Sequence, residues 1–520
     1  MFYENNFKVI LPEIFILTSL CFLLIYGVIY SNFENKTTLN YTVEFLKNNK
    51  IKKTLLLNSI VFLAIFILII VLFLIQNNPI TFLIGFNNTF IFNDFSNIIK
   101  VFVIFSTLSV LILLLGYNKT NKYYFYEYVI LILLALLGII LIISTNDLIT
   151  MYLTIEMQSL ALYVLAASKK NSEYSSEAGL KYFILGAISS GFLLFGSSLI
   201  YGFTGTVNFE FLSKLFSGFP LGSDTTPPLN LINLGVNFGL IFLISGLLFK
   251  LAAAPFHMWS PDVYEGSPSI ITIFFVITTK IAIFSLLIKL LILVFYDFIE
   301  IWQQFVIFSS ICSLLIGAFA ALPQKRLKRL LAYSSITHVG FMLMGFSTGT
   351  IEGLQSLFLY VLGYMIMSLT TWSILLSLEI NLTKDKNNRL NYLSDLSMLH
   401  LNNPILALTF SLVLFSLAGV PPLFGFFSKL YVICAAIDSF MYNFALIGLL
   451  TSVLGAFYYL KLIKIMYFEK IDRFYFYKKI DKEKSIIIST SSLVILFFFI
   501  YPNPFFLLTH KLALFAVCII

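Results

Sequence analysis

Long apolar stretches separated by short polar segments run along the chain from residue 11 to residue 508. A transmembrane helix needs about 20 consecutive apolar residues, because each residue adds about 1.5 Å along the helix axis. The pattern therefore predicts an all-α polytopic membrane protein with about fourteen transmembrane helices. The predicted spans are residues 11–31, 54–75, 96–117, 126–145, 147–167, 179–203, 231–256, 269–295, 304–322, 330–347, 353–379, 404–437, 441–468 and 485–508.

Positive charge in the predicted loops alternates with the spans. The loops after odd-numbered spans contain 22 Lys or Arg residues, whereas the loops after even-numbered spans contain only Lys214. Loops on the cytoplasmic or matrix side of a membrane carry such an excess. One span more or fewer would destroy the alternation, so the charge count favours fourteen spans. It also predicts that both termini lie on the side opposite to the positively charged loops.

Two of the predicted spans contain prolines that interrupt the helix. Residues 404–437 would form a helix of roughly 51 Å, whereas the hydrocarbon core of a bilayer is about 30 Å thick. Pro421 and Pro422 lie in this span, and proline removes a helical hydrogen bond and clashes with the preceding turn. Pro255 interrupts the span 231–256 in the same way. We therefore predict two broken helices.

The two breaks indicate an internal repeat. They lie 167 residues apart, counted from Pro255 to Pro422, and the segments SEAGLKYF at 176–183 and TIEGLQSL at 350–357 are weakly similar. Interrupted helices in matching places of two halves are typical of transporters with an ion site at the membrane midplane. Chance similarity between apolar segments is the alternative explanation for the two similar segments. The predicted units are an N-terminal three-helix segment (1–125), a first five-helix bundle (126–295, spans 4–8), a second five-helix bundle (296–468, spans 9–13) and a C-terminal loop with span 14 (469–520).

Composition excludes a soluble protein. The chain is 59% hydrophobic and only 11% charged, whereas soluble domains are about 25% charged. The formal net charge of +8 resides in the loops and reports membrane orientation, so we expect contact with membrane lipids and no nucleic-acid partner. Frequent Phe, Tyr, Ile, Asn and Lys fit an AT-rich genome such as that of an organelle.

Cysteine and histidine offer no ligand set for a redox group. The four cysteines lie far apart in apolar stretches, without a Cys-x-x-Cys pair. The four histidines include no pair at i, i+4 spacing that could hold a haem or a metal on one helix face. We therefore expect no cofactor, no metal and no catalytic redox site on this chain.

Four ionisable residues fall deep within predicted spans: Glu156, Lys250, Lys280 and Lys429. Each costs about 2.5–3.5 kcal/mol at the centre of a membrane helix, so a compensating role is expected. Residues that merely lock helices together in pairs are the alternative. One carboxylate for three amines leaves two amines without a carboxylate partner, which favours groups that exchange protons near neutral pH.

His338 lies midway along its predicted span and is a candidate relay between lysines, because imidazole titrates near neutral pH. A histidine that is hydrogen-bonded to a nearby serine or backbone carbonyl is the alternative. Lys280 and Lys289 are nine residues apart and therefore lie on opposite faces of a helix, so only the deeper Lys280 is assigned to the path. Other charges near span ends are expected to extend toward the interface: Lys100 beside Asp94, Lys181, Lys289, Glu379, Lys461 and Lys464.

Five segments resemble the antiporter-like membrane-arm subunits of NADH:ubiquinone oxidoreductase, respiratory complex I, and in particular the organelle-encoded subunit 2 family. The similarity extends from PEIF at 12–15 to THKLAL at 509–514. The segments are TIEMQSLALYVLAASKK (154–170), EAGLKYFILGAISSG (177–191), FKLAAAPFHMWSPDVYEGSP (249–268), KRLLAYSSITHVGF (328–341) and LAGVPPLFGFFSKLYV (417–432).

The resemblance implies two inverted five-helix bundles with broken helices 7 and 12. It also implies a proton path through Glu156, Lys250, Lys280 and Lys429, coupled to quinone reduction elsewhere in the complex. The chain would then be a non-redox subunit of a proton-translocating NADH:ubiquinone reductase in the mitochondrial inner membrane, with the other membrane-arm subunits as partners.

Two further functions remain open from the sequence. The first is a subunit of a multi-subunit cation/proton antiporter, which shares this fold and these Glu and Lys positions. The second is a passive membrane scaffold. Asp262 and Glu265, in the loop after the seventh span, could gather protons at the matrix side. A solvated pair of loop carboxylates is the alternative.

Overall fold

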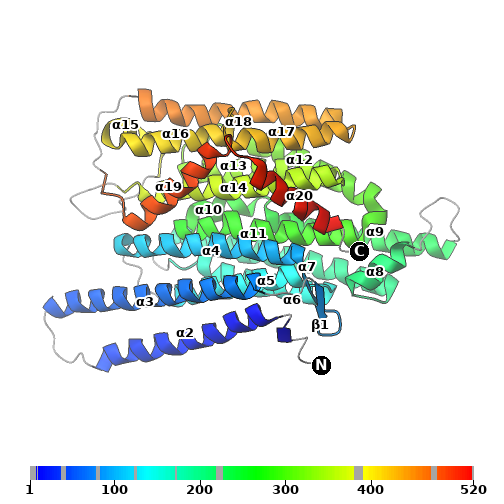
Figure 1. Cartoon of the computed structure of the whole chain (residues 1–520), viewed down its shortest axis with the longest axis horizontal. Helices are drawn as coiled ribbons and strands as arrows, with labels where there is room; N and C mark the ends of the chain where they lie inside the picture. The colour runs from blue at the N-terminus through cyan, green and yellow to red at the C-terminus, as the bar shows by residue number, and fades with distance from the viewer. Residues whose placement is uncertain are drawn as a thin grey trace.

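The computed structural model describes residues 7–8, 10–36, 43–77, 82–121, 126–169, 172–217, 227–379, 391–469 and 477–517. Within these ranges, twelve helices are long and apolar enough to cross a membrane by length and composition. Figure 1 shows most helices running side by side in stacked layers, while α19 and α20 run obliquely to them. The predicted all-α polytopic membrane fold is confirmed.

The N-terminal segment contains three long helices and a short hairpin. Strands β1 (Phe82–Gly85) and β2 (Phe90–Asn93) pair antiparallel, with Phe82 opposite Asn93. The sequence analysis did not predict this hairpin, which lies between the second and third spans and places the start of the third helix. The helices are α2 (Leu11–Lys36), α3 (Val43–Gln76) and α4 (Asp94–Asn121).

The next elements cover the predicted first bundle. The α-helices are α5 (Glu127–Ser144), α6 (Leu148–Ala166), α7 (Glu173–Thr204), α8 (Phe209–Ser217), α9 (Pro227–Leu251), α10 (Trp259–Gly266) and α11 (Ser269–Ile288). A π-helical turn η1 (Lys289–Val294) continues α11, and a 3-10 turn η2 (Tyr296–Phe298) follows it.

The remaining elements cover the predicted second bundle and the C-terminal segment. They are α12 (Ile299–Ala321), α13 (Leu327–Ser347), α14 (Ile351–Ser377), η3 (Leu393–Leu396), α15 (Leu399–Asn402), α16 (Pro404–Ala418), α17 (Phe424–Asp438), α18 (Tyr442–Phe468), α19 (Lys482–Phe497) and α20 (Asn503–Val517). In Figure 1 the start of α2, strand β1 and the end of α20 lie at the same edge of the molecule; we call it the terminus edge.

Both predicted helix breaks are confirmed. Pro255 lies between α9 and α10, and Pro421 and Pro422 lie between α16 and α17. The peptide groups at such breaks lack the partners that a continuous helix would supply, so they are available to side chains. The relation between the two halves as inverted repeats, and the four predicted domain boundaries, stay predictions.

Two of the predicted spans each consist of two helices in the structure. The predicted twelfth span consists of α16 and α17, and the predicted fourteenth span, 485–508, consists of α19 and α20. Pro502 and Pro504 explain the second of these interruptions, because α19 ends before them and α20 begins at Asn503. The total of fourteen spans stays a prediction, and some of the Lys and Arg residues that support it, such as Lys384 and Arg389, lie outside the described residues.

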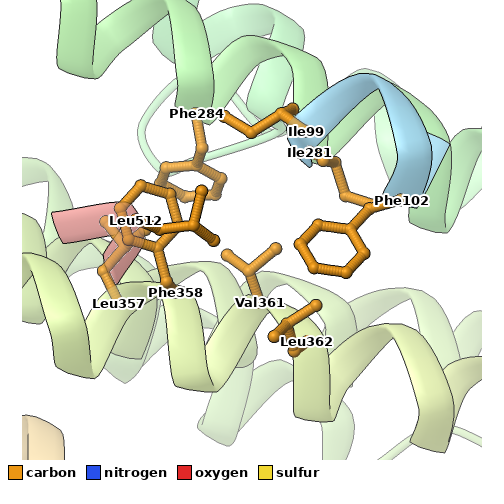
Figure 2. Close-up of a pocket in the computed structure, with 9 residues that line it drawn as sticks. All are labelled: Ile99, Phe102, Ile281, Phe284, Leu357, Phe358, Val361, Leu362 and Leu512. Carbon is orange, nitrogen blue, oxygen red and sulfur yellow. The ribbon is translucent and has the colours of Figure 1, made fainter. Parts of the chain in front are cut away.

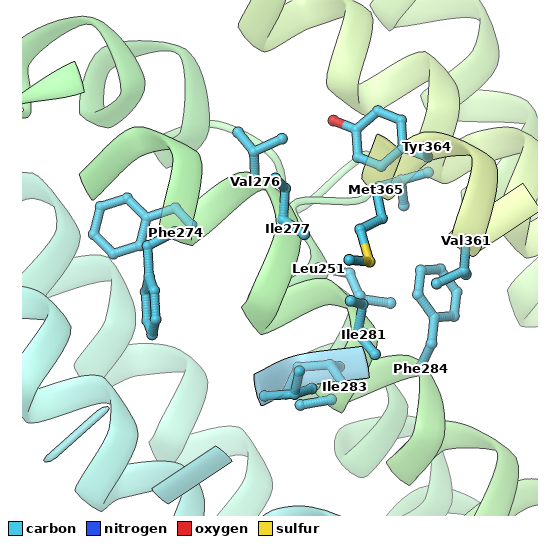
Figure 3. Packing of buried hydrophobic residues seen from close by; sticks show 14 of the residues in the cluster. Leu251, Phe274, Val276, Ile277, Ile281, Ile283, Phe284, Val361, Tyr364 and Met365 are labelled. Carbon is cyan, nitrogen blue, oxygen red and sulfur yellow. The ribbon is translucent and has the colours of Figure 1, made fainter. Parts of the chain in front are cut away.

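Helix α11 is the centre of the fold. All 20 of its residues are buried, and it packs against α4, α5, α9 and α14. Figure 3 shows Ile277, Ile281 and Phe284 of α11 among side chains of α14, including Val361 and Tyr364. A helix that is buried on every side needs other helices around it rather than lipid. Ionisable groups on α11 are therefore enclosed by protein.

The outer helices carry the opposite pattern. Phe62, Phe66 and Phe73 on α3 are each about three-fifths exposed: 60%, 61% and 60%. Large exposed aromatic residues at helical spacing are unfavourable in water and favourable against lipid chains. The exposed face of α3 therefore fits a lipid-facing or subunit-facing surface.

Helices α7 and α9 approach closely at glycines, as membrane helices do at small residues. A Cβ added at Gly196 would lie 2.6 Å from the carbonyl oxygen of Gly239 and 2.8 Å from the amide nitrogen of Leu243.

We expect Gly196→Ala to lower the thermal unfolding temperature of the purified protein in detergent, because overpacking costs about 1–3 kcal/mol. The control is Gly191→Ala on the same helix, where an added Cβ has nothing within 4 Å. Equal unfolding temperatures for the two variants would contradict the close packing.

Candidate functional site

Glu156 and Lys250 form the first group of ionisable side chains. Glu156 lies in the middle of α6, and its Oε2 accepts a hydrogen bond from Ser159 Oγ at 3.2 Å. Lys250 lies at the C-terminal end of α9, where the helix breaks, with its Nζ 5.9 Å from the centre of the Tyr163 ring. The charges of Glu156 and Lys250 attract each other. However, Lys250 Nζ and Glu156 Oε1 are both buried without a hydrogen-bond partner in the described part of the chain.

Glu156 and Lys250 therefore form no direct ion pair among the described residues, and the attraction between their charges acts over a longer distance. An ammonium group has three donors, and a buried one without acceptors is unfavourable. Lys250 is thus the least satisfied of the four predicted ionisable groups.

Lys280 lies in the middle of α11 and is only 3% exposed. Its Nζ donates a hydrogen bond to the carbonyl oxygen of Ser335 on α13 at 3.3 Å and lies 5.1 Å from the centre of the Tyr364 ring. The ring provides a cation–π contact and the carbonyl a single acceptor. Lys280 has no carboxylate partner among the described residues, and its amine points from the first bundle into the second.

His338 lies on α13, one turn after Ser335, and is 3% exposed. Its Nδ1 is 2.7 Å from the hydroxyl of Tyr360 on α14, and its Nε2 is 3.1 Å from the hydroxyl of Tyr459 on α18. Both ring nitrogens therefore have a partner that can donate or accept a proton. Among the described residues, neither of the predicted alternatives, a serine or a backbone carbonyl, is a hydrogen-bond partner of His338.

Lys429 lies on α17 and is 8% exposed. Its Nζ donates hydrogen bonds of 2.8 Å to the carbonyl oxygens of both Leu417 and Ala418, at the end of α16. These carbonyls are available because α16 ends there. The break at Pro421 and Pro422 therefore supplies the acceptors that a lysine in hydrocarbon needs.

The structure separates the five predicted path residues into two groups. The positive charges of Lys280 and Lys429 both act on His338, so these three residues form one group. Glu156 and Lys250 form the other group, and no hydrogen bond joins it to Lys280 within the described ranges. Among the described residues no hydrogen bond joins Lys280 to His338 or His338 to Lys429 either. The hydrogen-bond partners of His338 are the hydroxyls of Tyr360 and Tyr459.

Asp262 and Glu265 lie on α10 and form a network of charges with residues of α7 and α13. Asp262 pairs with Lys181 at 2.8 Å and with Arg329 at 3.5 Å, and Glu265 pairs with Arg326. The hydrogen bond from Arg326 to Glu265 raises the pKa of the arginine. The proposed proton-uptake role stays a prediction. The structure adds that these carboxylates connect elements of the two predicted bundles.

Three of the charges that were expected to extend toward the interface are buried. Lys100 pairs with Glu13 on α2 rather than with Asp94, Lys289 donates to the carbonyl of Ile143, and Glu379 pairs with Lys484 at 3.5 Å. The prediction was wrong for them because their partners come from helices distant in the sequence. Lys461 and Lys464 are exposed as expected.

The sequence analysis missed the tyrosines that surround the lysines and His338. Tyr360 and Tyr364 lie one turn apart on α14, and Tyr458 and Tyr459 are adjacent on α18. All four are buried. The i, i+4 spacing of Tyr360 and Tyr364 is the only feature of the sequence that points to these tyrosines.

In the part of the chain that is described, no three His, Cys, Asp or Glu side chains lie close enough together to hold a metal ion.

Comparison with known proteins defines the class. The sequence profile of the family described as NADH:quinone oxidoreductase/Mrp antiporter, transmembrane, matches residues 145–455. The chain therefore belongs to this family of proton-antiporter-like membrane subunits. A chain of the Mrp complex from Dietzia sp. shares the fold, with 19% identity and a TM-score of 0.75 over 100% of this chain and 98% of that chain.

Closer relatives place the chain in the complex I branch of that family. It is 44% identical to NADH-ubiquinone oxidoreductase chain 2 of Marchantia polymorpha, over 98% of this chain and 99% of that protein. It is 42% identical to NADH-quinone oxidoreductase subunit N of Pelagibacter ubique, over 96% and 97%. A chain of respiratory complex I from Thermus thermophilus matches with 26% identity and a TM-score of 0.68, over 94% and 98%. The predicted family is confirmed.

The two tyrosine hydroxyls at His338 give a direct test of this site. We expect Tyr360→Phe and Tyr459→Phe each to lower the thermal stability of the purified protein by about 1–3 kcal/mol, because each leaves a buried ring nitrogen without its partner. Differential scanning fluorimetry in detergent measures the change. Tyr26→Phe on α2, a partly buried tyrosine whose ring packs against that of Tyr30 with the centres 4.4 Å apart, is the control. Stability equal to that of the control would contradict the hydrogen-bonding role.

Proposed function

We propose that the chain is a proton-translocating subunit of the membrane arm of NADH:ubiquinone oxidoreductase, located in the mitochondrial inner membrane. The observation that carries the proposal is the buried series Lys280, His338 and Lys429. In this series a histidine with two hydroxyl partners lies between two lysines that have only carbonyl acceptors. Both termini are proposed to face the intermembrane space, in agreement with the loop charges.

Protons would move along the series by changes in local electrostatics. When the interaction of Glu156 with Lys250 weakens, Lys250 holds its proton less firmly, and the proton passes toward Lys280, His338 and Lys429. Moving one charge through the membrane potential costs about 2.3 kcal/mol per 100 mV. A change of two units in the pKa of one buried group supplies about 2.7 kcal/mol. Local pairing is therefore sufficient to gate the movement.

The chain is proposed to act without a bound redox group. Quinone is reduced in another part of the complex, and the neighbouring membrane-arm subunits transmit the effect to Glu156. A subunit of a cation/proton antiporter is the second candidate, because the fold is shared with the Mrp complex. A native gel that is stained for NADH oxidation and probed for this chain distinguishes them. Comigration supports the first function, whereas sodium-dependent proton exchange without NADH oxidation supports the second.

Replacement of Glu156 tests the start of the series. We expect Glu156→Gln to assemble normally, because Gln keeps the size and the hydrogen bond with Ser159. Coupled quinone reduction should fall, because the negative charge that attracts Lys250 is lost. The measurement is NADH:quinone activity and proton pumping of the complex in vesicles. Glu352→Gln, which removes an exposed carboxylate at the start of α14, is the control. Normal turnover with intact pumping would reduce Glu156 to a packing residue.

Replacement of Lys429 tests the end of the series. Lys429→Met keeps the stem and deletes the titrating amine, so we expect assembly to persist and proton pumping to be lost. Lys429→Arg should restore little, because a guanidinium does not release its proton near neutral pH. Lys464→Met, an exposed lysine on α18, is the matched control. An Arg variant that pumps like the wild type would show that Lys429 is only a fixed positive charge.

A further inference from the structure

Four lysines with buried ammonium groups each have an aromatic ring close to the Nζ atom. The face of an aromatic ring attracts a cation within about 6 Å, and the attraction is strongest where water is excluded. The distances from Nζ to the ring centre are 5.5 Å for Lys100 and Phe92, 5.9 Å for Lys250 and Tyr163, 5.1 Å for Lys280 and Tyr364, and 5.6 Å for Lys429 and Phe341.

Lys250 differs from the other three lysines because it has the ring and no hydrogen-bond acceptor. Lys100 also bonds a carboxylate, Lys280 bonds one carbonyl and Lys429 bonds two. Lys250 Nζ has no hydrogen-bond partner among the described residues, and the charge of Glu156 attracts it over a longer distance. The ring is therefore the short-range electrostatic contact on which this ammonium group depends.

The ring that faces Lys250 belongs to Tyr163 on α6. Tyr163 follows Glu156 by seven residues, or about two turns, so both side chains lie on the same side of the helix. It is 7% exposed. A Cβ added at Gly186 on α7 would overlap with the Tyr163 hydroxyl. The position of the ring therefore depends on the space that this glycine leaves.

Two further rings support Tyr163 from the side. The Tyr182 ring on α7 meets the Tyr163 ring edge to face, with centres 4.8 Å apart. Tyr182 in turn stacks on Trp259 of α10, with centres 4.7 Å apart and 23° between the planes. Both arrangements are favoured for aromatic pairs. We call Tyr163, Tyr182 and Trp259 the aromatic bracket, and it joins α6, α7 and α10.

The aromatic bracket ends on the residue next to Lys250. Trp259 Nε1 donates a hydrogen bond of 2.8 Å to the carbonyl oxygen of Phe249, and the centres of the two rings are 5.8 Å apart. In a continuous helix the amide of Ala253 would bond this carbonyl, whereas here it bonds the carbonyl of Leu248. The broken end of α9 therefore anchors the bracket and also carries the lysine that the bracket faces.

We propose that Tyr163 is a positioning residue for Lys250, and that the aromatic bracket keeps its ring against the ammonium group. The proposal rests on the proposed proton-translocating function. The ring stabilises the charged lysine without offering an acceptor, so the amine stays free to respond to the charge of Glu156. If the three rings only packed helices together, their effect would not depend on the charge of Lys250.

A double-mutant cycle tests whether the ring acts on the charge. Lys250→Met keeps the stem and removes the ammonium group, and Tyr163→Leu removes the ring. The thermal unfolding temperature of the full chain in detergent is measured for the wild type, both single variants and the double variant. We expect Tyr163→Leu to lower it by about 2 °C less in the Lys250→Met background, because no cation is left to attract. Equal effects in the two backgrounds would overturn the proposal.

The matched control is Phe358→Leu in the same two backgrounds. Phe358 is 6% exposed, close to Tyr163 in burial. It lines a cavity of about 20 Å³ whose nine lining side chains are all apolar (Figure 2). We expect the same lowering of the unfolding temperature with and without the Lys250 ammonium group. A dependence on Lys250 as large as that of Tyr163 would not require the ring contact and would overturn the proposal.

Coupled quinone reduction by the complete complex in vesicles gives a second readout, expressed per assembled complex on the native gel. Tyr163→Leu should lower this rate about fivefold or more, because the ring contact is lost. Tyr163→Phe keeps the ring and should restore most of the rate, and Phe358→Leu should stay within about twofold of the wild type. A Phe variant as impaired as the Leu variant would assign the effect to the hydroxyl and overturn the proposal.

Trp259→Leu tests the anchor of the bracket, because it removes both the stacked ring and the hydrogen bond to Phe249. The control is Trp302→Leu on α12, another buried tryptophan, which donates a hydrogen bond of 3.0 Å to the carbonyl of Phe295 and stacks on Phe346. We expect only Trp259→Leu to lower the rate per assembled complex, by about threefold or more. Equal rates in the two variants would overturn the role of the bracket.

Failure of this proposal is distinguishable from failure of the proposed function. Normal pumping by Lys429→Met would contradict the proposed function, and the cycle of unfolding temperatures would still test the contact between Tyr163 and Lys250. Additive effects in that cycle, beside lost pumping in Lys429→Met, would contradict only the positioning role of Tyr163.

Discussion

An amine inside a membrane must find acceptors within the protein, and this requirement explains most of the structure. Water would satisfy three donors on each ammonium group, whereas lipid chains satisfy none. Continuous helices use their own carbonyls, so the available acceptors are broken helix ends, carboxylates and aromatic rings. Lys429 uses the broken end of α16, Lys100 uses Glu13, and Lys280 uses one carbonyl and the ring of Tyr364.

The two broken helices meet this requirement to different degrees. In the second half, Lys429 bonds two carbonyls across the break. In the first half, Lys250 stands at the end of α9 with an aromatic ring nearby and no hydrogen-bond partner among the described residues. In both halves a lysine lies near a proline that breaks a helix, but Lys429 has two hydrogen-bond acceptors and Lys250 has none among the described residues. The lysine at the proposed start of the series is therefore the one with the fewest partners among the described residues.

Much of the fold could be predicted from the sequence, because span length and proline act locally. The apolar stretches predicted the helices, and Pro255 and the Pro421–Pro422 pair predicted the breaks. The ionisable positions Glu156, Lys250, Lys280 and Lys429 followed from the cost of charge in hydrocarbon. Nothing local marks Glu13 as the partner of Lys100, 87 residues away. Nor does anything distinguish Tyr459 among 28 tyrosines as a partner of His338. Such partners depend on how the helices pack, which periodicity does not specify.

The hydrogen bonds from Lys429 to Leu417 and Ala418 join the end of α16 to a residue of α17. The last carbonyls of a helix carry the negative end of its dipole, so an ammonium group there is favoured over a neutral amine. Loss of the proton removes the charge that compensates this dipole and weakens both hydrogen bonds, because bonds from a charged donor are stronger, although the neutral amine keeps two N–H groups for the two carbonyls. The charge on Lys429 therefore sets the strength of the link between α16 and α17.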